Sequence, residues 1–450
     1  MMGGMSQKVK PAKRKASSVR HTRAIQRERS QHPLVTPPPE QITARLTEFI
    51  LPATEAQQAS AHQTFGLRLR DLTPVVMMAL VLSLIWRQVG NISVGVRLLN
   101  SEGLLWAAAM PVTQQAVSLR FGSLSADLFL RVLAAVLPRC QARWQARDRP
   151  LPPELAWAQA HYTRVLACDG STLDALVRKI GLLHGWATHP LAGRMTALLD
   201  LCSRLPQRVW YEPDPQAHDQ RAWPQIVNAL LPGTLLMVDL GYTNFVIFAQ
   251  LTQASVKFIT RAKTNLTYDL DRVVQRSANV HDRIIWVGRG DARQRLRLVE
   301  VLYQGLWYRY LTNELDADQL PTAYVVALYW QRWRIEEAYA IVKRLLGLAY
   351  WLTGSENGVC LQLWATWLLY AVLVDLTDAV AEALKKPFAA ISLEMVYRSL
   401  YFFGQAVQRG EATDVITYLT ANAAWLGLLK RPSKRLSLEL LLPLTKSADP

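Results

Sequence analysis

Four residues between positions 329 and 343 have side chains that suit a site for phosphate and metal ions. They are Tyr329, Arg332, Glu336 and Lys343, and the last three lie 3, 7 and 14 residues after the first. On a helix that turns by about 100° per residue, all four fall on one side, within an arc of about 60°. A carboxylate beside an arginine, a lysine and a phenol is poorly suited to a hydrophobic core. The spacing indicates a groove that holds a metal ion and clamps phosphates.

An ordinary solvated helix face is the alternative interpretation of these residues. Arg332 and Glu336 are four residues apart, which is the spacing of an exposed helical ion pair. The remaining positions argue for a packed helix, because they carry large apolar side chains. These anchors are Leu328, Ile335, Val342, Leu345 and Leu346, with Trp330, Trp333 and Tyr339 on the flanks. If the helix is packed in this way, its charged stripe must line a groove.

Two aspartates upstream supply further carboxylates. Asp169 follows the apolar run 165–168, and Asp239 follows the apolar run 235–238. Each run predicts a buried strand, and an acid at the end of such a strand is costly to bury unless it is paired or metal-bound. Either aspartate alone could be a turn or helix-capping residue. Together with Glu336 they form a set of three hard oxygen ligands for magnesium or manganese.

These motifs resemble those of the DDE transposases of bacterial insertion sequences. The resemblance rests on DGST at Asp169, DLGY at Asp239 and the run Tyr-x2-Arg-x3-Glu-x6-Lys, which defines the insertion sequence four family. It spans about residues 100 to 370. In that family, the two aspartates and the glutamate hold two catalytic metal ions on a ribonuclease-H-like core. The resemblance therefore implies these roles for Asp169, Asp239 and Glu336, with two Mg²⁺ or Mn²⁺ ions as cofactors.

The resemblance also implies a reaction and its partners. Tyr329, Arg332 and Lys343 would grip the phosphates at the end of the mobile element. The enzyme would nick double-stranded DNA with water, form a hairpin at the element's end, and join the reopened 3′ ends to target DNA. Family members cut only within a dimeric synaptic complex, so we expect a DNA-bound homodimer in the bacterial cytoplasm, associated with the nucleoid.

Two other functions stay open on the sequence alone. A ribonuclease-H-like endonuclease or junction resolvase uses the same acids to cut DNA without joining it. A domesticated DNA-binding protein would have no catalysis, but the intact set of three acids argues against it.

The expected fold is α/β, with a ribonuclease-H-like catalytic core at 156–350 and helical regions at 43–155 and 351–450. A β-rich subdomain is expected as an insertion at about 245–315, in the long interval between Asp239 and Glu336. Alternating polar and apolar residues from 295 to 301 are typical of a half-exposed strand. The expected strands of this region are 256–260, 283–287, 296–303 and 306–311, and a hairpin across 195–212 supplies two core strands.

Three residues of this insertion are candidates for DNA contact. Arg261 and Lys263 resemble the family's basic pair beside the terminal DNA, although a solvated strand end would look the same. Hairpin formation needs a base flipped out of the duplex and an aromatic side chain that fills or supports the gap. Trp307, on the last strand before the glutamate helix, is the expected plug, with packing in the sheet core as the alternative.

A second DNA contact is expected in the N-terminal helical region. Residues 111–120 resemble a helix-turn-helix element, in which Thr113 caps a helix. The side chains expected to contact DNA are Gln114, Gln115, Ser118 and Arg120. A surface helix in a bundle is an equally good interpretation of this segment.

The charge of the chain suits a polyanionic partner. The 450 residues carry a net charge of +16, and residues 1–30 carry +8 of it. Residues 1–42 are therefore expected to form a disordered basic arm and a proline-rich linker, with a solvating tail as the alternative to a DNA-grasping arm. The four cysteines lack CxxC spacing, which argues against zinc. The apolar runs 72–86 and 361–374 are shorter than the roughly 18 residues of a membrane span, so no membrane segment is expected.

Overall fold

The computed structural model describes residues 39–65, 71–89, 91–174, 191–348, 351–431 and 438–445. The predicted basic arm and most of its linker lie outside these ranges. Residues 39–42, which were predicted as linker, instead begin helix α2. A proline at the first helical position is compatible with this start, because its missing N–H has no helical partner there in any case.

The described N-terminal part of the chain is built of helices joined by loops. Its helices are α2 (Pro39–Phe65), α3 (Pro74–Trp86), α4 (Ile92–Ser101), α5 (Gln114–Ser123), α6 (Asp127–Ala146) and α7 (Pro153–His161). Helix α3 illustrates the local causes. Thr73 caps it by accepting a hydrogen bond from the amide of Val76, and its run of apolar side chains is almost wholly buried.

A nine-stranded mixed sheet forms the other half of the molecule. Its strands are β1 (Arg164–Asp174), β2 (Leu191–Asp200), β3 (Pro206–Glu212), β4 (Thr234–Val238), β5 (Lys257–Arg261), β6 (Asp269–Arg276), β7 (Val280–Val287), β8 (Gln294–Tyr303) and β9 (Leu306–Thr312). Their order is β3-β2-β1-β4-β5-β9-β8-β7-β6. Strand β4 runs parallel to both β1 and β5, and the other pairs are antiparallel. The predicted α/β class is confirmed at this level.

The β-rich insertion is an extension of the main sheet. Strand β9 pairs with β5, with Ile259 opposite Thr312 and Arg261 opposite Tyr310. The predicted interval of 245–315 also includes helix α9 (Phe245–Gln253) and strand β5, which pairs with β4. The extension proper is therefore the antiparallel set β6 to β9.

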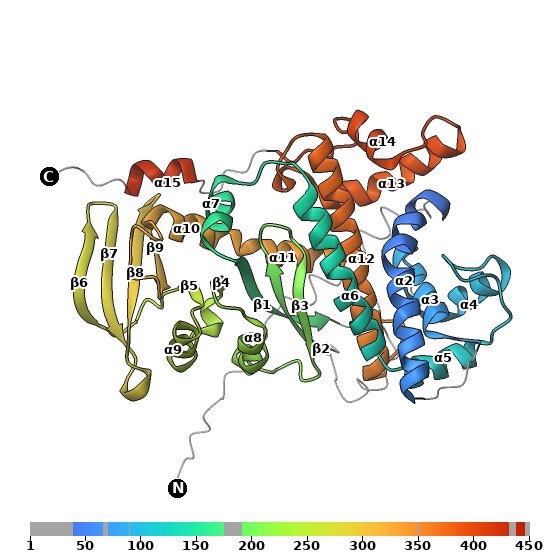
Figure 1. Cartoon of the computed structure of the whole chain (residues 1–450), viewed down its shortest axis with the longest axis horizontal. Coiled ribbons are helices and arrows are strands. Elements are labelled where there is room, and N and C mark those ends of the chain that lie inside the picture. Colours follow the sequence, from blue (N-terminus) through green and yellow to red (C-terminus); the bar gives the residue numbers. More distant parts are fainter. Residues whose placement is uncertain are drawn as a thin grey trace, which may run out of the picture.

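Helices cover both faces of the sheet and fill the rest of the molecule. They are α8 (Trp223–Ala229) and α9, then α10 (Thr322–Gln331), α11 (Trp333–Ala340), the π-helical segment Ile341–Leu345, α12 (Glu356–Ala383), α13 (Leu393–Gln408), α14 (Val415–Ala421) and α15 (Leu438–Thr445). Figure 1 shows α6 and α12 between the sheet and helices α2 to α5. Helix α15 returns to pack against α10, and Thr445 accepts a hydrogen bond from the Gln275 side chain at 2.9 Å.

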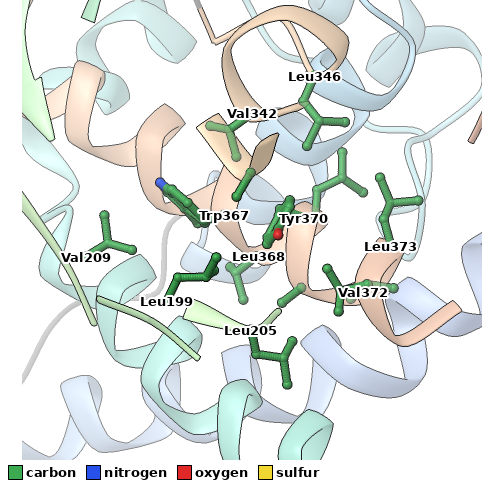
Figure 2. Close-up of a cluster of buried hydrophobic side chains, with 14 of the residues drawn as sticks. Leu199, Leu205, Val209, Val342, Leu346, Trp367, Leu368, Tyr370, Val372 and Leu373 are labelled. Carbon is green, nitrogen blue, oxygen red and sulfur yellow. The ribbon is translucent and has the colours of Figure 1, made fainter. Parts of the chain in front are cut away.

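The strands are apolar on both faces because each face has its own core. In β1, Val165 and Ala167 belong to the larger core beside α12, whereas Leu166 and Cys168 belong to the core beneath α8 and α9. Strands buried on both faces appear as continuous apolar runs in the sequence. Figure 2 shows part of the larger core, where Trp367 and Tyr370 of α12 lie among Leu199, Val209 and Val342.

Helix α12 passes through the middle of this larger core. Ser355 caps it by accepting a hydrogen bond from the amide of Gly358, and the helix runs for 28 residues, well beyond the apolar run 361–374. Among the described residues, α12 is long and apolar enough to cross a membrane, and a bent pair, α5 with α6, passes the same test only if counted as one span. In α12, 94% of the apolar window is buried inside the protein, as in a core helix.

Candidate functional site

Asp169 lies within a strand, where one of its two partners ends. The prediction that it ends its strand is wrong, because β1 continues to Asp174 with β2 as its antiparallel partner. The parallel pairing with β4 stops one residue earlier, at Cys168 opposite Val238. Asp169 therefore stands where β1 and β4 diverge, which is the kind of position where open α/β sheets bind ligands.

Asp239 follows β4 directly and precedes a short 3₁₀ turn, Leu240–Tyr242. The predicted strand end is correct here. Because β1 and β4 are parallel and Cys168 pairs with Val238, the next residue of each strand is an aspartate at the same edge of the sheet. The fold thus brings together two carboxylates that are 70 residues apart in the sequence.

The predicted helix across 329–343 is divided into three segments. Helix α10 ends at Gln331, Arg332 forms the junction, α11 follows, and residues 341–345 are wound as a π-helix. A π-helical turn contains more residues than an α-helical turn, so it changes the direction of later side chains. Lys343 reaches β1, where its Nζ donates to Thr172 O at 2.7 Å and Ser171 Oγ at 3.3 Å.

Arg332 is the centre of the site. Its guanidinium donates to Asp169 Oδ2 at 3.0 Å and to Glu336 Oε1 at 3.1 Å, and it lies 3.7 Å from Asp239 Oδ1. Tyr329 donates to the same Asp239 oxygen at 3.3 Å. The three predicted acids and two of the three predicted phosphate-binding residues therefore converge, with one guanidinium among three carboxylates.

The pKa values reflect this crowded and partly buried setting. Burial raises the pKa of Asp169 to about 6, although Arg332 and the amide of Gly170 oppose the shift. Burial also raises the pKa of Glu336, again against the effect of Arg332. Burial lowers the pKa of Arg332, but Tyr329 and the three carboxylates outweigh it, so its pKa is raised overall. The guanidinium stays charged, and it serves as the counter-ion of the acids.

The carboxylates suit a divalent ion chemically, but their present arrangement does not enclose one. In the described ranges, no group of three or more His, Cys, Asp or Glu side chains is placed to hold a metal ion. The reason is visible in the contacts of Arg332, whose guanidinium lies between the three acids. All three acids nevertheless meet at one cation, and their oxygens are the donors that magnesium and manganese prefer.

An aromatic cavity adjoins Arg332. Its volume is about 290 Å³, and it is lined by Arg261, Tyr308, Tyr310, Tyr329, Trp330, Arg332 and Trp333. The guanidinium carbon of Arg332 lies 5.4 Å from the ring centre of Trp333 and 5.8 Å from that of Tyr329. Arg261 therefore lines the same cavity as Arg332, and its expected contact with DNA stays a prediction. Lys263 is exposed and does not line the cavity.

Trp307 lies elsewhere. Alternate residues of a strand point to opposite faces, so Trp307 faces away from Tyr308 and Tyr310, which line the cavity. Its ring stacks on His281 at 4.6 Å, and the side chain is exposed. This exposure rules out packing in the sheet core, whereas the expected role of Trp307 as the plug stays a prediction.

Helix α5 carries the residues predicted to form the second DNA contact. Thr113 caps it as predicted, accepting a hydrogen bond from Ala116 N at 3.1 Å. Gln114, Gln115 and Ser118 are exposed. Arg120 is half-buried and donates to the carbonyl of Leu72 at 2.9 Å, so it also fixes α5 to the segment that precedes α3. Figure 1 shows α5 at the opposite end of the molecule from β6 to β9.

One ion pair beside the acids has no signal in the sequence. Arg194 of β2 pairs with Asp219, which begins the 3₁₀ turn Asp219–Ala222. A Cβ atom on Gly170 would lie 2.7 Å from Arg194 Nη2 and 2.7 Å from Asp219 Oδ1, so this pair packs against the glycine of the DGST motif. Nothing in the sequence analysis identified either residue of this pair.

Comparisons with known proteins found similarity in the part of the chain that carries these acids. A family model described as "Transposase DDE domain" matches residues 165–372, which contain Asp169, Asp239 and Glu336. A protein of Sinorhizobium fredii (strain NBRC 101917 / NGR234) named "Putative transposase y4zB" is 27% identical over 217 residues. The match covers 45% of this chain and 59% of that relative, which is less than two thirds of the relative's length. The sheet and the helices that carry the three acids are therefore similar to a transposase DDE domain.

Proposed function

We propose that this chain is a DNA transposase of the insertion sequence four family, with Asp169, Asp239 and Glu336 as metal ligands on a ribonuclease-H-like sheet. One observation carries the proposal. Three carboxylates from three separate segments meet at a single cation, beside the diverging ends of two parallel strands. The match of the surrounding residues to a transposase DDE domain supports the same conclusion.

Two Mg²⁺ or Mn²⁺ ions are the cofactors that this set of donors suits. When bound, they would polarise the phosphodiester and activate the attacking water or 3′-hydroxyl. Arg332 must release carboxylate oxygens to make room for metal ions. Its freed guanidinium is then available to a phosphate, for which its planar pair of donors is well shaped. In this proposal Arg332 is a counter-ion before DNA binds and a phosphate clamp afterwards.

The cavity beside Arg332 supports a role in handling the end of the DNA. Arg261 and Arg332 supply positive charge, and Tyr308, Tyr310 and Trp333 supply rings on which a base can stack. We assign the flipped base of a hairpin reaction to this cavity, with Tyr308 in the role predicted for Trp307. Lys343 is held by the main chain of β1, so we assign it the support of the strand that carries Asp169.

The partners follow from the same proposal. The substrate is double-stranded DNA, first the ends of the element and then the target, and the charge of +16 suits it. Helix α5 would bind the DNA away from the acids, and the basic arm at residues 1–30 would add a further DNA contact. A homodimer in a synaptic complex is part of the proposal. A nuclease that cuts without joining is the second candidate, because the same acids serve it.

The central test removes each acid in turn. In Asp169→Asn, Asp239→Asn and Glu336→Gln, nicking of a donor plasmid that carries the inverted repeats flanking the gene is expected to be lost. Binding to those ends should remain, because metal ligation is removed and most DNA contacts are kept. Glu337→Gln is the matched control, since Glu337 pairs with Arg334 at 3.0 Å instead. Near-normal nicking by any one of the three variants with magnesium would falsify the assignment.

Two further assays separate the finer steps. Joining of a pre-cut end to a target plasmid distinguishes a transposase from a nuclease, which would leave the end free. For the base pocket, Tyr308→Ala is expected to permit the first nick and slow hairpin formation, whereas Trp307→Ala should affect neither. If Trp307→Ala slowed hairpin formation and Tyr308→Ala did not, Trp307 would be the aromatic plug. If Tyr308→Ala reduced nicking and hairpin formation equally, Tyr308 would have a purely structural role.

A further inference from the structure

The hydroxyl of Tyr339 connects the helix of Glu336 to the strand of Asp169. It donates a hydrogen bond to the main-chain carbonyl of Asp169 at 2.6 Å, and it accepts one from the amide of Ala197 at 3.1 Å. Asp169 and Ala197 are opposite each other in the β1–β2 pair. One phenol thus contacts both main chains at the position from which the Asp169 carboxylate projects.

Tyr339 is also one helical turn after Glu336. Residues three apart in a helix are neighbours on its surface, so the phenol and the Glu336 carboxylate leave α11 in similar directions. A single rigid element therefore holds one proposed metal ligand by its own side chain and contacts the backbone of another. The distance between the two ligands depends on this contact.

The ring of Tyr339 has little freedom to move. It is buried, and it packs edge-on against Trp367 of α12, with ring centres 6.2 Å apart and planes at 79°. Trp367 packs in the same manner against Tyr370, with ring centres 5.2 Å apart. Figure 2 shows Trp367 and Tyr370 in the apolar cluster beside Leu199 of β2. The hydroxyl is therefore fixed from behind as well as by its two hydrogen bonds.

We propose that Tyr339 is a positioning residue, which sets the spacing between Glu336 and Asp169 and thereby the affinity of the site for divalent metal ions. This inference rests on the proposed function, in which those two acids are metal ligands. Groups that orient metal ligands from outside typically contribute 10-fold to 100-fold to metal affinity or activity. Tyr339 acts through Asp169 and Glu336, and it touches no substrate.

The test compares Tyr339→Phe with Tyr370→Phe in the full chain. Tyr370 is a matched control, because it is also buried, packs on the same Trp367, and donates to a main-chain carbonyl, that of Arg204, at 3.0 Å. We expect Tyr339→Phe to weaken Mn²⁺ binding to the DNA-free protein about tenfold or more in calorimetry. In nicking assays with Mg²⁺, kcat should fall while KM for the DNA end stays constant, and excess Mn²⁺ should restore kcat. Tyr370→Phe should change none of these values.

Three results would overturn the proposal. Wild-type Mn²⁺ affinity in a folded Tyr339→Phe protein would leave Tyr339 with a structural role only. An equal loss of affinity in Tyr370→Phe would mean that general loosening of the core is the cause. Unchanged Mn²⁺ binding by Asp239→Asn would refute the metal site itself, which identifies failure of the proposed function.

A second variant keeps the test decisive if Tyr339→Phe does not fold. Trp367→Phe leaves the hydroxyl of Tyr339 in place but reduces the ring that supports it. The Nε1 atom of Trp367 is buried without a hydrogen-bond partner in the described structure, so phenylalanine there loses no hydrogen bond. Weaker Mn²⁺ binding by Trp367→Phe would support the proposal, and unchanged binding would contradict it.

Discussion

Two clusters of opposite charge in this molecule are built in opposite ways. At the candidate site, the single guanidinium of Arg332 lies among three carboxylates. Between α2, α6 and α12, the single carboxylate of Asp375 accepts hydrogen bonds from three arginines. The donors are Arg45 at 2.9 Å, Arg143 at 3.2 Å and Arg147 at 2.7 Å. The neighbouring Asp378 accepts from Arg147 at 3.0 Å and from Arg149 at 2.5 Å.

The difference indicates which cluster serves stability and which serves function. The side chains of Asp375 and Asp378 are 0% and 1% exposed, and each has more than one cation as partner. Those of Asp169, Asp239 and Glu336 are 17%, 42% and 38% exposed, and they share one. A buried charge is tolerated only when it is well paired. Acids that are incompletely paired and open to solvent instead leave room for cations from outside.

The largest effect on folding is expected from Asp375→Asn. It removes the buried carboxylate that Arg45, Arg143 and Arg147 share, and breaking such a pair typically costs about 3–5 kcal/mol of unfolding free energy. Asp239→Asn should cost less than about 1 kcal/mol, because it removes one of three acids that repel one another. Urea denaturation of both variants checks this order. Similar losses in the two variants would remove the distinction between the clusters.

Divalent metal ions should affect the stability of the Asp375→Asn and Asp239→Asn variants differently. A ligand that binds only the folded state adds about 2.7 kcal/mol of stability at 100 times its Kd. Mn²⁺ should therefore raise the melting temperature of the wild-type protein and of Asp375→Asn, provided that the latter folds, and EDTA should reverse the effect. In Asp239→Asn the increase should be largely lost. The prediction is wrong if Mn²⁺ stabilises Asp239→Asn as much as wild type.

Arg332→Gln removes the guanidinium that pairs with the three acids of the site. Removing a positive charge that lies about 4 Å or less from each acid should strengthen Mn²⁺ binding to the DNA-free protein by about tenfold or more, since such pairs are worth up to about 4 kcal/mol near a protein surface. Nicking should fall at the same time, because the proposed phosphate clamp is lost. Arg334→Gln, whose arginine pairs with Glu337, is the control for charge. Weaker Mn²⁺ binding in Arg332→Gln would show that the arginine supports the metal site instead of competing with it.

The smallest effect is expected from Gly170→Ala. The added methyl group meets Arg194 Nη2 and Asp219 Oδ1 at 2.7 Å and the Tyr242 hydroxyl at 3.3 Å, so it should separate Arg194 from Asp219 without moving the backbone. A single exposed or half-exposed pair is worth at most about 1 kcal/mol, and the urea midpoint should shift accordingly. The nicking rate should stay close to that of the wild type. If Gly170→Ala lowered the nicking rate as much as Asp239→Asn does, Asp219 would be a fourth essential acid.

The sequence predicted the components of the site better than their geometry. Asp239 was correct as a strand end, because a strand buried on both faces is a continuous apolar run that stops where the strand stops. Asp169 follows a similar run, but its strand continues through Gly170 and Ser171 with β2 as partner. The sequence of one strand does not reveal which antiparallel strand will pair with it, so this continuation could not be predicted.

The division of the helix and the position of Trp307 escaped prediction for related reasons. No residue type indicated that residues 341–345 would take π-helical winding, so the contacts of Lys343 with β1 were not predicted. Alternation along β9 requires Trp307 and Tyr308 to face opposite sides. The sequence could not indicate which side faces the acids, because that depends on the pairing of β9 with β5. Asp219 was missed because it lies in a short turn without an apolar pattern.

The return of α15 to α10 has a consequence for synthesis of the chain on the ribosome. Helix α10 leads into Arg332 and Glu336, and part of its surface is covered by Leu438 and Leu441, which are buried in the folded protein. The ribosome makes α10 long before α15. The face of α10 that α15 covers therefore stays exposed to solvent until α15 has been synthesised and packs against it. Helix α10, which carries Tyr329 of the candidate site, therefore gains its final packing only after α15 has been synthesised.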